Sequence, residues 1–235
     1  MRLVACMTIL GLLGCQSTGS DQGVPIHYDI GVVHREVTTT SPEAQLWFDR
    51  GLGLTYGFNH EEAILCFERA AEADPGCAMA HWGKAYALGP NYNDTERTEE
   101  ASRAAQEAAR LALAGIGDCT PAEQALIEAL QARYASVDPA DRATLDAAYA
   151  DEMRAVRAAY PDDADVAALC GESLLMLRPW KLWSPEGVPA PETAEIRQVL
   201  EAGRCDAPPS RAVESPGRPR HVREHHQSLL DPVVE

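Results

Sequence analysis

The sequence predicts an all-α protein in which antiparallel helix pairs stack side by side as an α-solenoid over residues 41–203. Apolar residues recur at helical spacing through this region. Short breaks that contain Gly, Pro or Asn divide it into segments of helical length. The pattern of residues 47–54 also returns 34 residues later. A fixed period of this length is typical of repeat proteins built from helix pairs.

Residues 44–75 define the repeating unit. Its first half carries an apolar stripe formed by Ala44, Trp47, Phe48, Gly51 and Leu54. Its second half carries another stripe, formed by Ala63, Cys66, Phe67, Ala70 and Ala71. Gly57 interrupts the pattern between them, and Asn59 is placed to cap the second helix, with Glu62 reaching back to its amide. We therefore expect two antiparallel helices joined by a short turn.

Small residues stand where these two helices must approach closely. Gly51 and Ala63 leave room for the crossing. A glycine inside a helix is destabilising by roughly 1 kcal/mol relative to alanine, so close packing is the expected compensation. Pro75 ends the second helix because it disfavours helical geometry at Asp74.

Six residues of the unit carry a family resemblance. They match the spacing W-x2-L-G-x2-Y, A-x3-F and P at Trp47, Gly51, Ala63, Phe67, Ala70 and Pro75. The segment thus resembles the tetratricopeptide repeat (TPR) family, although Arg50 and Leu54 stand where the pattern has Leu and Tyr. The resemblance implies a module whose first helices line a groove for an extended peptide or a partner helix.

A second unit follows in register. Three positions of the first unit return after 34 residues, at His81, Ala85 and Leu88. Residues 78–88 are therefore expected to form its first helix, and residues 96–114 its second, after an inserted loop at 89–94. The stretches FNHEEA and CAMAHWGKAYALGPNYN resemble a secreted or lipid-anchored bacterial subgroup of TPR proteins.

The remaining helical region starts at a clear N-terminal signal. Thr120, Pro121 and Glu123 combine a cap, a first-turn proline and a capping-box acid. Helices are expected over residues 121–134, 139–160, 163–177 and 191–203. Gly171 follows a proline by ten residues, as Ala85 does, so it marks the first helix of a later unit.

Residues 1–14 are interpreted as a targeting signal. Arg2 precedes an apolar run that is too short to span a bilayer. The run ends in Leu-Leu-Gly-Cys, which resembles the lipobox of bacterial lipoproteins. The resemblance implies that Cys15 becomes a lipid-bearing N-terminus in the cell envelope, and Gln16 after it favours the outer membrane. An ordinary secretory signal that leaves a soluble protein is the alternative.

The two ends of the helical region differ from it in composition. Residues 15–40 carry few apolar side chains and are expected to form a tether and an extended lead-in, with Val33 and Val37 along the first helix pair. Residues 204–235 are rich in Pro, Arg and His and show no helical period. Two interpretations of this tail stay open. It is a disordered C-terminus, or the reading frame is lost near Gly203 and the array is truncated without a terminal cap.

Composition limits the classes of function. The chain has 235 residues, of which 46% are hydrophobic and 24% charged, so it suits one soluble domain or array. Its formal net charge of -16 argues against nucleic-acid binding through phosphate neutralisation. The charge permits a basic partner, and a solvated acidic surface is the alternative.

Aromatic and polar side chains of the second unit are the candidate partner-binding residues. They lie on its first helix and the loop after it: His81, Trp82, Tyr86, Asn91, Tyr92 and Asn93. Aromatic anchors with polar neighbours suit peptide recognition, and packing inside the unit is the alternative. Trp47 occupies a packing position and is expected to be buried. Trp180 and Trp183 are expected to clamp neighbouring helix pairs.

The sequence supports metal binding and disulfide formation less than it supports partner binding. His60 lies beside two glutamates, but adjacent residues of a helix point apart and no second His is placed to converge with them. His221, His225 and His226 have i, i+4 spacing within the tail. No metal or cofactor is therefore predicted. Small buried thiols are expected, with disulfides as the alternative in an exported protein, at Cys66, Cys77, Cys119 and Cys170.

The sequence thus predicts a non-catalytic protein–protein interaction module of the bacterial cell envelope, attached to the membrane only through its lipid. Its partner is a protein or peptide. A small-ligand or metal-binding envelope protein that uses His60, His81 and the loop with Asn91 and Asn93 is one alternative. The other is the N-terminal fragment of a larger TPR protein whose active part is missing.

Overall fold

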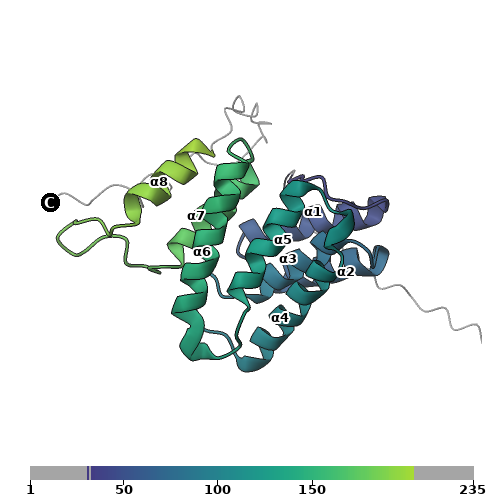
Figure 1. The fold of residues 1–235 in the computed structure, drawn as a ribbon, viewed down its shortest axis with the longest axis horizontal. Helices are drawn as coiled ribbons and strands as arrows, with labels where there is room; N and C mark the ends of the chain where they lie inside the picture. The colour runs from purple at the N-terminus through teal and green to yellow at the C-terminus, as the bar shows by residue number, and fades with distance from the viewer. Residues whose placement is uncertain (1–30, 32, 204–235) are drawn as a thin grey trace, which may run out of the picture. The chain divides into compact units, whose positions relative to one another are not determined.

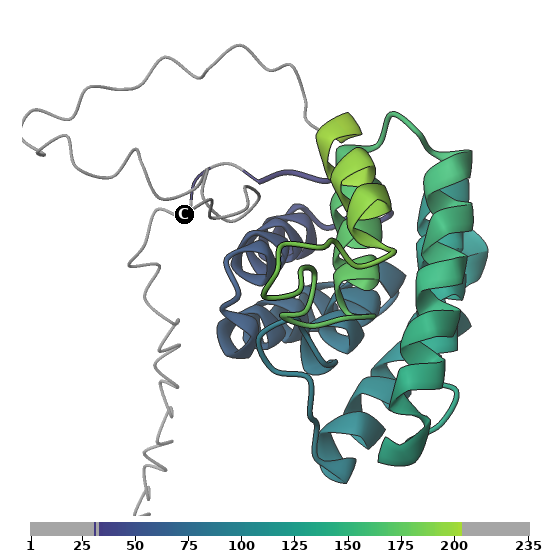
Figure 2. The ribbon, with the colours of Figure 1, turned by 90° about the vertical axis from the view of Figure 1, so that its left-hand side faces the viewer.

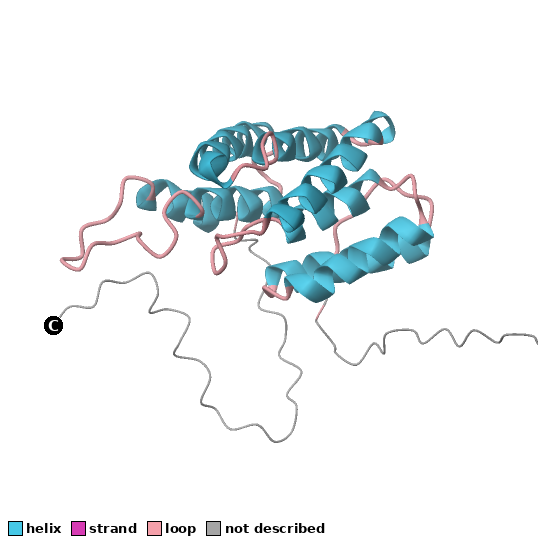
Figure 3. Cartoon of the chain, turned by 90° about the horizontal axis from the view of Figure 1, so that it is seen from below, coloured by secondary structure: helices cyan, strands magenta, loops and turns pink. Residues whose placement is uncertain are grey.

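Helices form nearly all the regular structure of Gly31 and residues 33–203, the part of the chain that the computed structural model describes (Figure 1). Its eight α-helices are α1 (Pro42–Tyr56), α2 (His60–Ala73), α3 (Ala78–Leu88), α4 (Glu99–Ala114), α5 (Pro121–Arg133), α6 (Arg142–Ala159), α7 (Ala164–Leu175) and α8 (Thr193–Ala202). Short 3-10 turns cover Ile116–Asp118 and Pro139–Asp141. The described residues contain no β-strand, as Figure 3 shows. The all-α prediction is confirmed for this part. The predictions for residues 1–14, Cys15 and 204–235 lie outside it.

Each helix packs against the helix that follows it in the chain. Only three residues separate α1 from α2, so this packed pair runs antiparallel. In addition, α3 contacts both α1 and α5. Figure 2 shows α8 lying along α7, beside α6.

Phe67 of α2 fits between two glycines that belong to two other helices. A Cβ atom on Gly51 of α1 would lie 2.7 Å from the Phe67 ring, and one on Gly83 of α3 only 2.3 Å from it. The ring of Phe48 packs 5.6 Å from that of Phe67. The close approach expected at Gly51 is therefore made by the Phe67 ring. Ala63, expected to share the crossing, is fully buried on the same helix as Phe67.

Trp47 differs from its expectation. It is only partly buried, and the Arg69 guanidinium lies 5.0 Å from the centre of its ring. Phe48 is fully buried instead. Successive residues of an α-helix are rotated by about 100° around its axis, so the neighbour of Trp47 faces the core.

Most helix ends agree with the sequence signals. The Ser41 side chain accepts from the Ala44 N–H at the start of α1, and Thr120 and Glu123 form the expected capping box. α2 ends at Ala73, before the exposed Pro75. α4 starts at residue 99 rather than 96, and α7 ends at residue 175 rather than 177.

The turn between α1 and α2 is closed differently from the prediction. Asn59 stands at the N-cap of α2, but its side chain makes no capping hydrogen bond. Its backbone N–H donates instead to the Leu54 carbonyl, and the Phe58 N–H donates to the Thr55 carbonyl. The Asn59 N–H is thus bonded to the end of α1 rather than to the Glu62 side chain that the sequence assigned to it.

The four described cysteines are free thiols, and all are buried. Burial raises the pKa of Cys119 and of Cys170 to about 11. The expectation of small buried thiols is confirmed. No described helix has the length and apolar character needed to cross a membrane.

Candidate functional site

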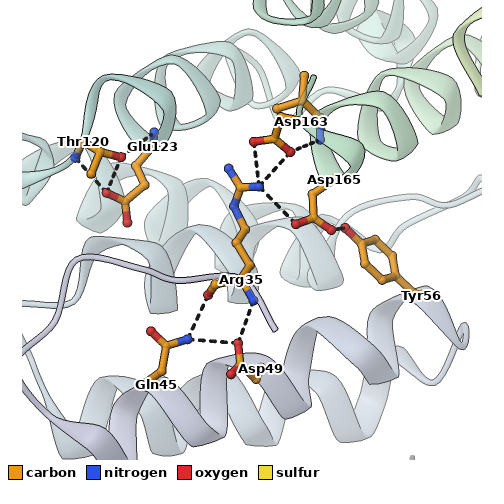
Figure 4. A network of polar contacts seen from close by, with 9 residues as sticks. Arg35, Gln45, Asp49, Tyr56, Thr120, Glu123, Asp163 and Asp165 are labelled. Carbon is orange, nitrogen blue, oxygen red and sulfur yellow. Dashed lines mark hydrogen bonds and ion pairs between the residues drawn. The ribbon is translucent and has the colours of Figure 1, made fainter. Parts of the chain in front are cut away.

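An extended segment, residues 33–40, crosses helices that are distant in sequence (Figure 4). We call this segment the lead-in. Side chains of α1 bind its backbone: the Arg35 N–H donates to Asp49 (3.1 Å), and its carbonyl accepts from Gln45 (2.8 Å). The Val37 N–H also donates to Gln45 (3.0 Å). The helix thus binds the lead-in as it would bind an extended peptide.

The Arg35 side chain ties the lead-in to the start of α7. Its Nη1 atom lies 3.0 Å from both carboxylate oxygens of Asp163 and 3.1 Å from Asp165. Tyr56, at the end of α1, donates its hydroxyl to Asp165 at 2.6 Å. Burial, reinforced by the Asp165 carboxylate, raises the pKa of Tyr56. Figure 4 shows these groups converging between α1 and α7.

The lead-in also reaches α5. Thr38 donates both its backbone N–H and its hydroxyl to Glu123, the capping-box acid. Val37 is buried. The sequence placed the lead-in along the first helix pair, but the structure extends its contacts to α5 and α7. The reason is polar, because carboxylates at the starts of those two helices pair with the Arg35 charge and accept hydrogen bonds from Thr38.

Beyond Tyr56, side chains of α1, α3 and α7 line a partly open cavity of about 200 Å³, which we call the aromatic pocket. The loops after α1 and α3 and single residues of α2 and α8 complete its lining. Its aromatic walls are Tyr56, Phe58, Tyr86 and Tyr92. Its aliphatic walls include Leu169, Leu175 and Leu200. The polar lining is sparse and includes Asn91, His60 and Glu172. A mostly apolar cavity with a few converging polar groups is the usual form of a binding site.

Glu172 is the acidic group of the aromatic pocket. Its Oε2 atom accepts from the Tyr86 hydroxyl at 3.1 Å, and its Oε1 atom lies 3.8 Å from Arg133. That second distance is too long for a hydrogen bond. Burial raises the pKa of Glu172, while the Arg133 charge opposes this rise. Oε1 is therefore the carboxylate oxygen that remains available to a further donor.

Arg133 does not line the pocket but packs against one of its walls, the Tyr86 ring. Its side chain is 1% exposed, and its guanidinium lies 5.4 Å from the Tyr86 ring and 4.9 Å from the Tyr149 ring. It donates to the Pro90 carbonyl at 2.6 Å. Trp82 stacks on Tyr86 at 5.5 Å. These contacts hold the Tyr86 ring in place as a wall of the pocket.

Two exposed aromatic residues, one in the pocket wall and one next to it, have unusual backbone conformations. Phe58 and Trp180 are the non-glycine residues with positive φ in the described chain, at 58° and 61°. Their exposed fractions are 52% and 68%. The Trp180 ring lies 4.8 Å from that of Tyr92, and the backbone N–H of Trp180 donates to the Tyr92 hydroxyl. Positive φ is strained for bulky residues, and such strain clusters at functional sites.

The structure separates the six candidate binding residues. Tyr86, Asn91 and Tyr92 line the aromatic pocket. Trp82 lies in the core, 1% exposed, and its indole donates to the Leu126 carbonyl. His81 is partly buried outside the pocket, and Asn93 lines a neighbouring hollow. Trp180, expected as a clamp between helix pairs, is exposed instead.

Several residues of the pocket were missed by sequence reasoning. Glu172 carries a signal that could have found it, because it is a lone acid within the apolar run of α7. Phe58 has a weaker one, as an aromatic next to a turn glycine. Tyr56 and Arg133 carry no such sequence signal, since their contacts bring together distant parts of the chain.

Metal binding and histidine chemistry find little support in the described part of the chain. Its His, Cys, Asp and Glu side chains form no group of three that could hold a metal ion. Burial lowers the pKa of His60, which packs edge-on against Phe58. No family model, curated protein or solved structure matches the chain.

Proposed function

We propose that this chain is a TPR-like protein-interaction module of the bacterial cell envelope, anchored by lipid at Cys15. The proposal depends most on the period of the buried positions. Three buried residues of α1 recur 34 residues later as buried residues of α3: Ala44, Phe48 and Leu52 correspond to Ala78, Trp82 and Tyr86. This is the period of the TPR family.

The packing of the helices supports the same proposal. α1, α3, α5 and α7 would be the first helices of successive pairs, and α3 contacts both α1 and α5. The lead-in binds side chains of α1, α5 and α7, and the aromatic pocket lies between α1, α3 and α7. In a TPR-like array this would be the ligand-binding face. The lead-in covers part of that face, so the aromatic pocket is where we place a partner.

Exposed aromatic anchors beside a sparsely polar pocket suit protein recognition. The test compares photo-crosslinking of the full chain in its host bacterium with that of the double variant Phe58→Ala/Tyr92→Ala. The matched control is Leu46→Ala/Leu65→Ala, which removes two exposed apolar residues outside the pocket. We expect the pocket variant alone to lose its crosslinked partners. Unchanged partners in the folded pocket variant would contradict the proposal.

The anchor is tested separately. Metabolic labelling with a palmitate analogue should mark the full chain, and Cys15→Ser should remove both the label and membrane association. A labelled Cys15→Ser protein would place the lipid elsewhere. An unlabelled native chain would refute the lipid anchor.

A further inference from the structure

We propose that the aromatic pocket binds a lysine side chain that a partner protein presents. The inference depends on the proposed interaction function and adds the chemistry by which the pocket recognises its partner. It starts from Glu172, whose Oε1 atom has no donor within hydrogen-bond distance while Oε2 accepts from Tyr86. A purely apolar occupant would remove water from that carboxylate without replacing its hydrogen bonds, which is unfavourable.

The walls around Glu172 suit a cation on an apolar stem. The faces of aromatic rings attract ammonium and guanidinium groups, and Tyr56, Phe58 and Tyr92 line the pocket. Tyr86 also lines it, but Arg133 and Trp82 already pack on its ring. Leucines complete the lining and match a four-carbon stem, since lysine buries its methylene groups readily. His60 adds no repulsion at neutral pH because burial lowers its pKa. The cation already near the carboxylate is Arg133, 3.8 Å from Oε1, and a bound lysine would share Glu172 with it.

Lysine fits this arrangement better than arginine does. Arginine binds a carboxylate best through two parallel hydrogen bonds, one to each oxygen. One oxygen of Glu172 is already bonded to Tyr86, so a single point donor matches the remaining site. The cavity of about 200 Å³ also admits one side chain rather than a larger ligand.

The net charge of the described chain and the residues around the pocket indicate that the bound lysine belongs to a protein rather than to a free amine. Residues 33–203 hold 14 basic and 29 acidic residues, so their formal net charge is 14 − 29 = −15. This field favours a basic partner. Phe58 in the pocket wall and Trp180 beside it are both exposed. They offer contact surface to the residues that flank a lysine in a chain, which a free amine lacks.

The test uses NMR titration of the full chain with three probes. These are a blocked peptide with a single lysine (Ac-AAKAA-amide), the same peptide with norleucine in place of lysine, and n-butylammonium. We expect the lysine peptide to shift the amide signals of Leu169 and Tyr92. We also expect it to bind roughly tenfold more tightly than the norleucine peptide, the factor expected for one charge-assisted hydrogen bond. n-Butylammonium should bind more weakly than the lysine peptide.

Two variants, each with a matched control, test whether the peptide binds in the aromatic pocket and whether Glu172 recognises its lysine. Glu172→Gln should remove the preference for lysine over norleucine, whereas Glu195→Gln on α8 should retain it. Ala168→Phe fills the pocket at a half-buried position and should abolish binding, whereas Ala132→Phe, half-buried on α5 and outside the pocket, should not. Because Ala168→Phe leaves the Arg133 pair intact, it keeps the test decisive if Glu172→Gln fails to fold.

Each opposing outcome overturns the inference. Equal affinity for the lysine and norleucine peptides would show an apolar anchor site, and equal affinity for butylammonium and the lysine peptide would show a free-amine site. Absence of binding by all three probes would show that the pocket is not a lysine site. These outcomes are independent of the crosslinking test, which reports whether any partner exists.

Discussion

The carboxylate of Glu123 accepts hydrogen bonds from both the backbone N–H and the hydroxyl of Thr38, at 2.7 and 2.6 Å. The same carboxylate accepts from the N–H and hydroxyl of Thr120 and so caps α5. Glu123 is 2% exposed. One buried acid therefore holds a helix start and the lead-in together.

We expect Thr38→Val to lower the free energy of unfolding by about 1.5 kcal/mol, the lower end for a hydrogen bond to a charged group. Urea unfolding of the full chain measures this change. Glu107→Gln is the control, because its pair with Arg110 is exposed and should change stability by less than about 0.5 kcal/mol. An equal effect of the two substitutions would contradict the role of the Thr38 hydroxyl.

The same carboxylate should make stability depend on pH. Burial opposes ionisation of Glu123, but the hydrogen bonds from Thr38 and Thr120 outweigh it and lower its pKa. Because the folded pKa lies below the unfolded one, the contribution is complete above the ordinary glutamate pKa. It is lost as pH falls through the folded pKa. The stability difference between the native chain and Glu123→Gln should therefore be constant near neutral pH and shrink in acid. A constant difference down to strongly acidic pH would contradict this assignment.

The sequence predicted the helices well because their signals are local. Apolar spacing, the Ser41 and Thr120 caps and Pro75 act within a few residues of one another. Trp47 shows the limit of such reasoning, since the sequence placed both Trp47 and Phe48 on the apolar stripe but only Phe48 is fully buried.

The candidate site could be predicted only in part because it depends on distant contacts. Arg35 and Asp163 are 128 residues apart, and Tyr86 and Glu172 are 86 apart. Composition and periodicity carry no information about which helix N-termini lie next to each other in the fold. Tyr86 and Tyr92 were found because the family resemblance implied a groove along the first helix of the second unit and the loop after it. Glu172 needed the structure to show that it faces Tyr86.

Gly83 should be intolerant of even one added methyl group. A Cβ atom there would lie 2.3 Å from the Phe67 ring, and Gly51 approaches the same ring atoms closely. Alanine gains up to about 1 kcal/mol in helix propensity, but overpacking in a close-packed core is destabilising by about 1–3 kcal/mol. We expect Gly83→Ala to lower stability by roughly 1 kcal/mol in urea unfolding. Gly117→Ala, with open space around its Cβ position, should not be destabilising. A stabilised Gly83→Ala protein would mean that Phe67 repacks freely.

Arg133 and Glu172 should be energetically coupled despite the 3.8 Å between their charged atoms. Arg133 is buried between Tyr86 and Tyr149, and its Nε and Nη1 atoms have no hydrogen-bond partner. Glu172 is thus the charge that compensates a guanidinium removed from water. Glu172→Gln should lower the free energy of unfolding by roughly 3 kcal/mol, because an uncompensated buried charge remains.

A double-mutant cycle tests this coupling. Arg133→Met fills a similar volume without charge, so the pair Arg133→Met/Glu172→Gln should be destabilised by clearly less than the sum of the single changes. The expected coupling is about 1–3 kcal/mol. The exposed pair Arg197–Glu201 is the control and should couple by less than about 0.5 kcal/mol. Additive single effects at Arg133 and Glu172 would show that the two charges are solvated independently. The carboxylate would then not depend on Arg133 for its charge balance.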